Sequence, residues 1–175
     1  FVVVYISFMG YAGDRVTAWL HPELDPGDTG YQILQSLYAI GSGGLLGLGY
    51  GKSRQKYLYL PFQYNDYIFA VICEELGLVG AMAIVALFAV TILRGYWIAL
   101  NARDRFSTVF AAGLVTLIAV QTILNLCVVT NLLPSTGIAL PFFSYGGTAL
   151  AVNLGEMGIV LGISRGRNRR KIQEA

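Results

Sequence analysis

YIFAVICEELGLVGAMAIVALFAVTILRGYWIAL is the sequence of residues 67–100, a long apolar stretch in which Glu74, Glu75 and Arg94 are the only charged residues. A helix that crosses a membrane needs about 20 consecutive, mostly apolar residues. The stretch exceeds that length. The sequence therefore predicts a transmembrane helix over residues 67–100.

Two further stretches have the same character. Residues 106–133 contain no charged residue, and residues 144–163 contain only Glu156. Of the whole chain, 55% is hydrophobic and 13% is charged, whereas a soluble domain has roughly 25% charged residues. The sequence therefore predicts an all-α, polytopic integral membrane protein. Residues 1–11 are apolar but too short to cross a bilayer, so they are expected to be the end of a truncated transmembrane helix.

Basic residues orient the predicted helices, because Lys and Arg are enriched in loops on the cytoplasmic side of a membrane. Residues 101–105 form a short connection with two arginines, and residues 164–175 form a tail rich in arginine. Both segments are therefore expected in the cytoplasm. Residues 12–66 and residues 134–143 then lie on the outer side, as a large and a small external loop.

The large external loop combines a predicted helix with a cluster of cations. We expect a helix over residues 31–40, followed by a glycine-rich turn. Lys52, Arg54 and Lys56 follow this turn, on the side of the membrane where basic residues are usually sparse. They form either an anion-binding site or a solvated loop that was translocated with its charges, since long loops obey the rule weakly.

Asp66 lies where the large external loop meets the helix predicted over residues 67–100. It is either the N-cap of that helix or a carboxylate available for chemistry, and the two roles are compatible. At helical spacing Ala70, Cys73 and Gly77 fall on the same face as Asp66. This small-residue face forms a shallow groove that could receive a neighbouring helix or the chain of a lipid substrate.

The small external loop, residues 134–143, places prolines and a glycine among apolar residues. Irregular apolar backbone is tolerated near a membrane when it is buried in protein or lines a cavity. We therefore expect a re-entrant-like loop that helps to shape a site. Ser144 and Tyr145, which follow it, are candidate substrate-binding residues.

Four blocks of the sequence resemble a known family. The chain is similar to the second half of SEDS proteins (shape, elongation, division and sporulation), most of all to the division (FtsW) and sporulation (SpoVE) branch. The blocks that carry this resemblance are GYQILQSLYAIGSGGLLGLGYGKSRQKYLYLP at 30–61, NDYIFAVICEELGLVGA at 65–81, NLLPSTGIALPFFSYGGTAL at 131–150 and EMGIVLGISR at 156–165.

The resemblance implies the C-terminal portion of the SEDS multi-helix fold, in the bacterial cytoplasmic membrane. It implies a peptidoglycan glycosyltransferase that polymerises lipid II into glycan strands during cell division, elongation or sporulation. The implied partners are a class B penicillin-binding protein and other membrane proteins of the divisome or elongasome, with no nucleic acid among them.

The resemblance also places the family's essential acidic residue on Asp66. The family commonly has a glutamate and a histidine shortly before it, but here Phe62, Tyr64 and Asn65 precede Asp66. Those two partner residues are therefore missing, whereas the aspartate is intact.

The chemistry of glycosyl transfer agrees with this assignment. A base must take the proton from the attacking sugar hydroxyl, and the carboxylate of Asp66 is suited to that role. The departing pyrophosphate needs positive charge, which Lys52, Arg54 and Lys56 would supply, alone or with a divalent cation. The sequence implies no other cofactor, and it assigns no metal ligand.

Two other classes of function stay open. A flippase would move lipid II across the bilayer and would rely on membrane-embedded carboxylates such as Glu74, Glu75 and Glu156. Unpaired carboxylates are costly inside a membrane, so each is expected to face protein, water or a cation. A non-catalytic scaffold would use the helices to hold partners of the division machinery.

Overall fold

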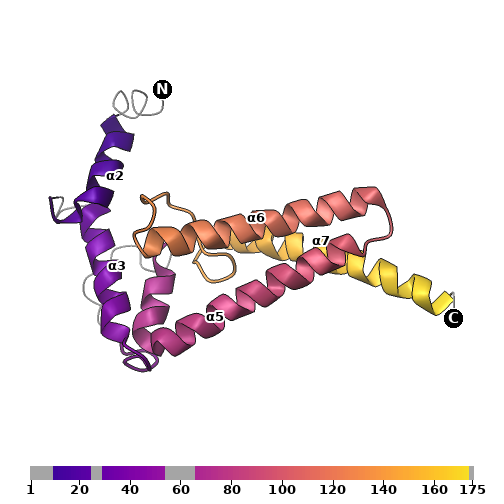
Figure 1. The fold of residues 1–175 in the computed structure, drawn as a ribbon, viewed down its shortest axis with the longest axis horizontal. Coiled ribbons are helices and arrows are strands. Elements are labelled where there is room, and N and C mark those ends of the chain that lie inside the picture. Colours follow the sequence, from indigo (N-terminus) through magenta and orange to yellow (C-terminus); the bar gives the residue numbers. More distant parts are fainter. Residues whose placement is uncertain (1–9, 25–28, 54–65, 174–175) are drawn as a thin grey trace. The chain divides into compact units, whose positions relative to one another are not determined.

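A computed structural model describes residues 10–24, 29–53 and 66–173 of the chain (Figure 1). Within these ranges all regular secondary structure is helical, so the predicted all-α fold class is confirmed. The elements are α2 (Gly10–Leu20), the 3-10 helix η1 (Pro22–Leu24), α3 (Thr29–Gly43), α5 (Ile68–Leu100), α6 (Arg105–Val129) and α7 (Gly147–Gln173).

Within the described ranges three helices are long and apolar enough to cross a membrane: α5, α6 and the Gly147–Gly166 part of α7. The end of α6 differs from the sequence prediction, which extended the helix to residue 133. Asn131 adopts a left-handed conformation with φ 58°, and the N–H of Leu132 donates to the carbonyl of Cys127 at 2.8 Å. This pattern is typical of a helix C-cap, which explains why α6 stops at Val129.

Helix α2 was not predicted from the sequence. The sequence analysis ended the first helical segment at residue 11, whereas α2 runs to Leu20. Its buried side includes Ala18, which is 2% exposed. The indole Nε1 of Trp19 donates to the carbonyl of Asn131 at 3.0 Å. Helix α2 therefore extends into the segment that we expected to be a loop.

Helix α5 is broken at Gly77, whose backbone has φ 67° and ψ −169°. In an unbroken helix the carbonyls of Glu74 and Glu75 would accept from the N–H groups of Leu78 and Val79. Instead, all four groups pair with the turn after α3. The bonds are Leu48 N to Glu74 O (2.9 Å), Gly49 N to Glu75 O (3.0 Å), Leu78 N to Gly44 O (2.9 Å) and Val79 N to Leu45 O (3.2 Å).

Glycine is required where this turn meets α5. Gly47 has φ +77°, and a Cβ added to it would lie 2.2 Å from the carbonyl oxygen of Glu75. A Cβ on Gly77 would lie 2.3 Å from the backbone nitrogen of Gly47. The turn therefore fills the deeper end of the small-residue face predicted below Asp66. Gly77 does not continue that face, because the helix breaks there, and a lipid chain cannot occupy its position.

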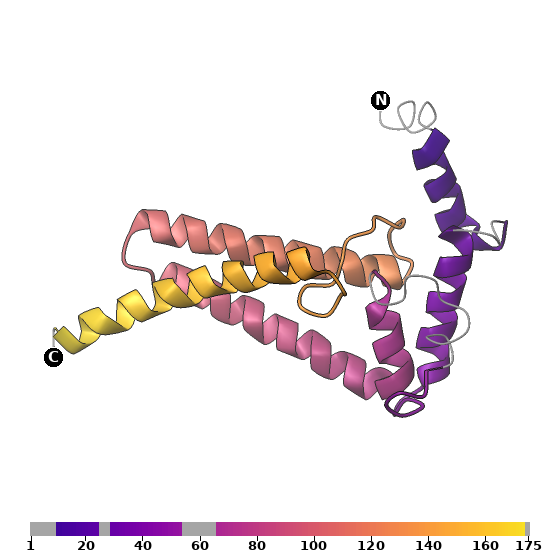
Figure 2. The ribbon, with the colours of Figure 1, turned by 180° about the vertical axis from the view of Figure 1, so that it is seen from behind.

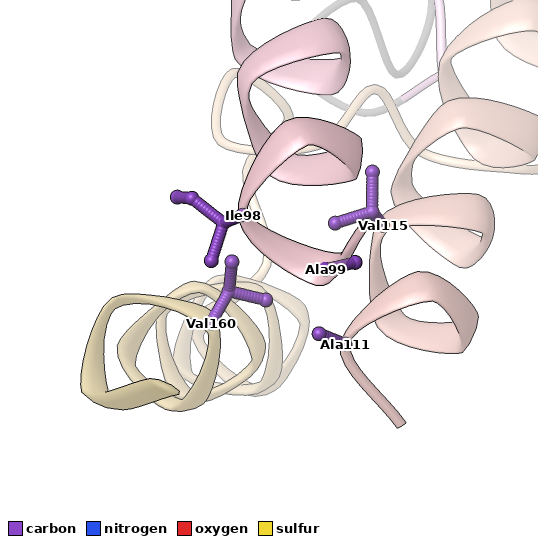
Figure 3. Packing of buried hydrophobic residues seen from close by; sticks show 5 residues of the cluster. All are labelled: Ile98, Ala99, Ala111, Val115 and Val160. Carbon is purple, nitrogen blue, oxygen red and sulfur yellow. The ribbon is translucent and has the colours of Figure 1, made fainter. Parts of the chain in front are cut away.

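The chain divides into two compact units, residues 1–81 with 124–138 and residues 82–123 with 139–175. In the second unit α7 packs against α5 and α6, and Figure 2 shows the three helices from the opposite side. Alanines let these helices approach closely. Figure 3 shows the buried cluster that joins them, which consists of Ile98, Ala99, Ala111, Val115 and Val160.

Candidate functional site

Asp66 lies in the first unit, in a turn that ends where α5 begins at Ile68. Its backbone carbonyl accepts a hydrogen bond of 2.8 Å from the side-chain amide of Asn125, in α6. A Cβ added to Gly137 would lie 3.6 Å from Asp66 Oδ2. The carboxylate therefore lies beside the loop that follows α6, and three segments of the chain converge on it.

Helix α2 supplies a cation to the same place. Arg15 lies near enough to Asp66 to act on its charge, and Arg15 Nη1 donates to the carbonyl of Ser135 at 3.0 Å. Together with the bond from Trp19 to Asn131, this contact attaches α2 to the loop after α6 at two points. Asp66 thus lies where α2, α6 and that loop meet.

Burial raises the pKa of Asp66 above its ordinary value, and the positive charge of Arg15 lowers it in part. Burial also raises the pKa of Tyr67 to about 12, with a further increase from the negative charge of Asp66 and a decrease from Arg15. The Tyr67 hydroxyl is buried and has no hydrogen-bond partner among the described residues. A pKa of about 12 keeps the Tyr67 phenol protonated at neutral pH. The raised pKa makes the neighbouring Asp66 carboxylate more basic, which suits proton transfer.

Helix capping does not account for Asp66. Among the described residues its carboxylate makes no hydrogen bond with a backbone N–H of α5, and Ala70 N instead donates to the carbonyl of Tyr67 at 3.0 Å. The capping role that the sequence left open is therefore not observed within the described part of the chain.

Of the three predicted anion-binding residues, Lys52 is exposed and follows the glycine-rich turn, where its N–H donates to the carbonyl of Gly49 at 3.1 Å. Arg54 and Lys56 lie outside the described residues. The intervening Ser53 is 1% exposed, and its hydroxyl donates to the carboxylate of Glu74. This bond attaches the residue next to Lys52 to the first part of α5, which begins shortly after Asp66.

The three acidic residues of the apolar stretches are all buried. Glu74 and Glu75 are 1% and 7% exposed and lie in the first part of α5, before the break. Glu156 is 8% exposed, and its Oε2 atom has no hydrogen-bond partner in the part of the chain that the structure describes. Across those same ranges no three residues of the types His, Cys, Asp and Glu are grouped in a way that could hold a metal ion, so a divalent cation remains a prediction.

Ser144 and Tyr145 belong to the second unit. The N–H of Leu140 donates to the Ser144 hydroxyl at 2.8 Å, and the N–H of Ser144 donates to the carbonyl of Leu140 at 3.1 Å. These two bonds close the turn before α7, so the Ser144 hydroxyl has a structural role there. Tyr145 is 85% exposed. A substrate-binding role for this pair stays a prediction.

The sequence analysis missed Arg15 and Asn125. Each is a polar residue in a mainly apolar setting, which is a detectable signal. Each, however, donates to backbone carbonyls of a distant segment, and a sequence pattern does not identify such partners.

Comparison with known proteins assigns the chain to a family. A family model described as cell cycle protein, covering FtsW, RodA and SpoVE, matches residues 1–169. The chain belongs to this family. It is the SEDS family that the sequence resembles, so the prediction is confirmed, including the FtsW/SpoVE branch.

Two curated SEDS relatives illustrate the match. The chain is 49% identical over 155 residues to stage V sporulation protein E of Bacillus subtilis, covering 89% of the chain and 42% of the relative. It is 45% identical over 164 residues to a probable peptidoglycan glycosyltransferase FtsW of Geobacter metallireducens, covering 94% of the chain and 44% of that relative. The chain therefore spans less than half the length of these relatives.

Two solved structures of SEDS type share the fold. One, described as structural coordination of polymerization and crosslinking by a peptidoglycan synthase complex, matches with a TM-score of 0.76 at 30% identity, over 95% of this chain and 45% of that one. The other is an aspartate-to-alanine mutant of the rod shape determining protein RodA of Thermus thermophilus. It matches with a TM-score of 0.58 at 34% identity, over 75% of this chain and 40% of that one. This SEDS chain is thus a multi-pass protein of the bacterial cytoplasmic membrane.

Proposed function

We propose that the chain forms the C-terminal part of a peptidoglycan glycosyltransferase that polymerises lipid II into glycan strands, in division, elongation or sporulation. Curated relatives that are 45% and 49% identical are named probable peptidoglycan glycosyltransferase FtsW. The observation that carries the proposal is the half-buried carboxylate of Asp66, whose pKa is raised by burial beside the cation of Arg15.

In the proposed reaction Asp66 accepts the proton of a sugar hydroxyl. The hydroxyl oxygen forms a bond to the anomeric carbon of the second sugar, and the bond from that carbon to the lipid-linked pyrophosphate breaks. The pyrophosphate leaves with the electron pair. Burial raises the pKa of Asp66 and so makes it a stronger base than an exposed aspartate, and the positive charge of Arg15 lowers that pKa in part.

The substitution Asp66→Asn tests the proposal. Asparagine keeps the size and polarity of the side chain but cannot take up the proton as a carboxylate does. Loss of a general base typically lowers a rate by about 10²- to 10⁴-fold, so we expect a folded variant that hardly polymerises lipid II. The assay uses the purified full-length protein with its penicillin-binding partner.

The matched control is Asp104→Asn, which changes an aspartate before α6. It should leave the polymerisation rate unchanged, because Asp104 lies outside the site unit and asparagine is also a good helix cap. Near-normal polymerisation by Asp66→Asn would refute the assignment of the base.

For the departing pyrophosphate we propose Lys52, Arg54 and Lys56, with or without a divalent cation. Lys52 is exposed, and the bond from Ser53 to Glu74 ties its segment to the part of α5 that begins next to Asp66. Replacing all three cations by Gln should raise the KM for lipid II roughly tenfold or more, since charge-assisted bonds to phosphate are strong. An unchanged KM in the triple variant would make this segment a solvated loop.

The proposed partners are a class B penicillin-binding protein and other membrane proteins of the divisome or elongasome. The structural neighbour described as a peptidoglycan synthase complex supports a partnership in which one protein polymerises and another crosslinks. Ser144 and Tyr145 are proposed to contact the substrate. Polymerisation of lipid II in a purified system would separate this function from the flippase and scaffold alternatives.

A further inference from the structure

We propose that Asn125 is a positioning residue that holds the backbone of Asp66 against the loop after α6. Asn125 is fully buried, at 0% exposure. Its Nδ2 donates to the carbonyl of Asp66 at 2.8 Å and to the carbonyl of Ile138 at 2.7 Å. A single side chain thus joins α6, the start of α5 and the loop that follows α6.

The chemistry of the amide explains why asparagine stands there. A primary amide carries two N–H donors in one plane, and here each of them reaches a different carbonyl. Neither Asp66 nor Ile138 lies in a helix, so their carbonyls lack the regular helical partners. The Oδ1 atom of Asn125 is buried without a hydrogen-bond partner among the described residues. A residue that served packing alone would avoid that cost, so the donor half of the amide is the part that the structure uses.

The second carbonyl belongs to the loop that contacts the Asp66 carboxylate. Gly137, next to Ile138, lies beside Asp66 Oδ2, and Ser135 accepts the hydrogen bond from Arg15. By binding Ile138 and Asp66 together, Asn125 fixes the distance between the carboxylate and the loop to which Arg15 is attached. The inference rests on the proposed role of Asp66 as the base and adds the residue that orients it.

The substitution Asn125→Leu removes both donors while keeping a similar volume. We expect kcat per folded molecule to fall roughly 10- to 100-fold, because small displacements of a reacting group have effects of that size, with little change in the KM for lipid II. We also expect the acidic limb of the pH–rate profile to move to lower pH. Burial raises the pKa of Asp66, so a released, better solvated carboxylate would ionise at lower pH.

Two variants control this experiment. Thr122 lies one turn earlier in α6 and is 3% exposed. Among the described residues it donates only within its own helix, to the carbonyl of Ile118 at 2.8 Å. Thr122→Val should therefore keep the wild-type kcat and pH profile. Asn125→Gln keeps the amide on a longer arm, and it should restore part of the rate that Asn125→Leu loses.

The outcomes separate this inference from the proposed function. An active Asp66→Asn variant would overturn both. An inactive Asp66→Asn together with a wild-type rate and pH profile in Asn125→Leu would overturn the role of Asn125 alone. An unchanged pH profile with less folded protein, or failure of both Asn125 variants to accumulate while Thr122→Val does, would assign Asn125 to stability and also overturn it.

Discussion

Two aspartates precede spanning helices in this chain, and their surroundings differ. Asp104 comes directly before α6 and is exposed. Its carboxylate accepts from the N–H of Ser107 at 2.9 Å and from the Ser107 hydroxyl at 2.8 Å. These bonds, the backbone one first, lower the pKa of Asp104. Asp104 is therefore an ordinary N-cap, and the first turn of its own helix satisfies it.

Asp66 has none of these local bonds among the described residues. Its surroundings come from α2, α6 and the loop after α6. Burial raises the pKa of Asp66, whereas the bonds from Ser107 lower the pKa of Asp104. An aspartate at the start of a helix is thus identified by what it contacts rather than by its place in the sequence. The start of α6 is built locally, whereas the start of α5 depends on segments far away in the chain.

The largest effect, on stability, is expected from Gly47→Ala, which disrupts the contact between α5 and the turn after α3. The new Cβ would meet the Glu75 carbonyl at 2.2 Å, at a φ of +77° that already disfavours alanine. The left-handed conformation alone costs about 1–2 kcal/mol, and the collision with backbone adds to that. We expect a large drop in the thermal midpoint of the detergent-solubilised protein.

Gly44→Ala is the matched control for this collision. Gly44 also has a positive φ, +54°, but a Cβ there would meet nothing within 4 Å. Only the conformational cost of about 1–2 kcal/mol remains. Equal losses of stability in the two variants would show that α5 does not depend on close contact with the turn.

A smaller effect is expected from Arg15→Gln, and it sharpens the electrostatic difference between the two aspartates. Arg15 lowers the pKa of Asp66, so removing its charge should raise that pKa further. A base that ionises at higher pH shifts the acidic limb of the pH–rate profile of polymerisation to higher pH. This direction is opposite to that expected for Asn125→Leu.

Arg15→Lys keeps the charge and should leave the limb near its wild-type position. A profile that does not move in Arg15→Gln would show that Arg15 serves only to bind the Ser135 carbonyl.

The smallest effect is expected from Asp104→Ala. Removal of this cap leaves the N–H of Ser107 without its side-chain partner, which should lower the thermal midpoint slightly. The rate of polymerisation per folded molecule should not change. A clear loss of rate would mean that Asp104 is more than a cap and would remove the contrast with Asp66.

The sequence predicted the elements that depend on composition. The length of the apolar stretches predicted the helices α5, α6 and α7, and the glycine content predicted the turn after α3. The break at Gly77 was not predicted, because the four bonds that stabilise it join backbone atoms only. Backbone pairing between distant segments leaves no side-chain pattern to detect.

The candidate site was predicted in part for the same reason. Asp66 was identified from its place at the start of an apolar run and from the family resemblance. Arg15 was missed because its side chain donates to a carbonyl 120 positions away in the sequence. Asn125 was missed because both of its acceptors are also carbonyls, so no complementary residue type marks them.

The break in α5 also affects how the helix matches the thickness of the bilayer. The 33 residues of α5 would form a straight rod about 50 Å long, whereas the hydrocarbon core of a bilayer is about 30 Å thick. The part after Gly77 is roughly 35 Å long and matches the core by itself. Hydrophobic mismatch then acts on that second part, whose tilt can change. The turn holds both sides of the break, because Leu48 and Gly49 donate to the first part and Gly44 and Leu45 accept from the second, so a change in the tilt of the second part acts on this turn as well.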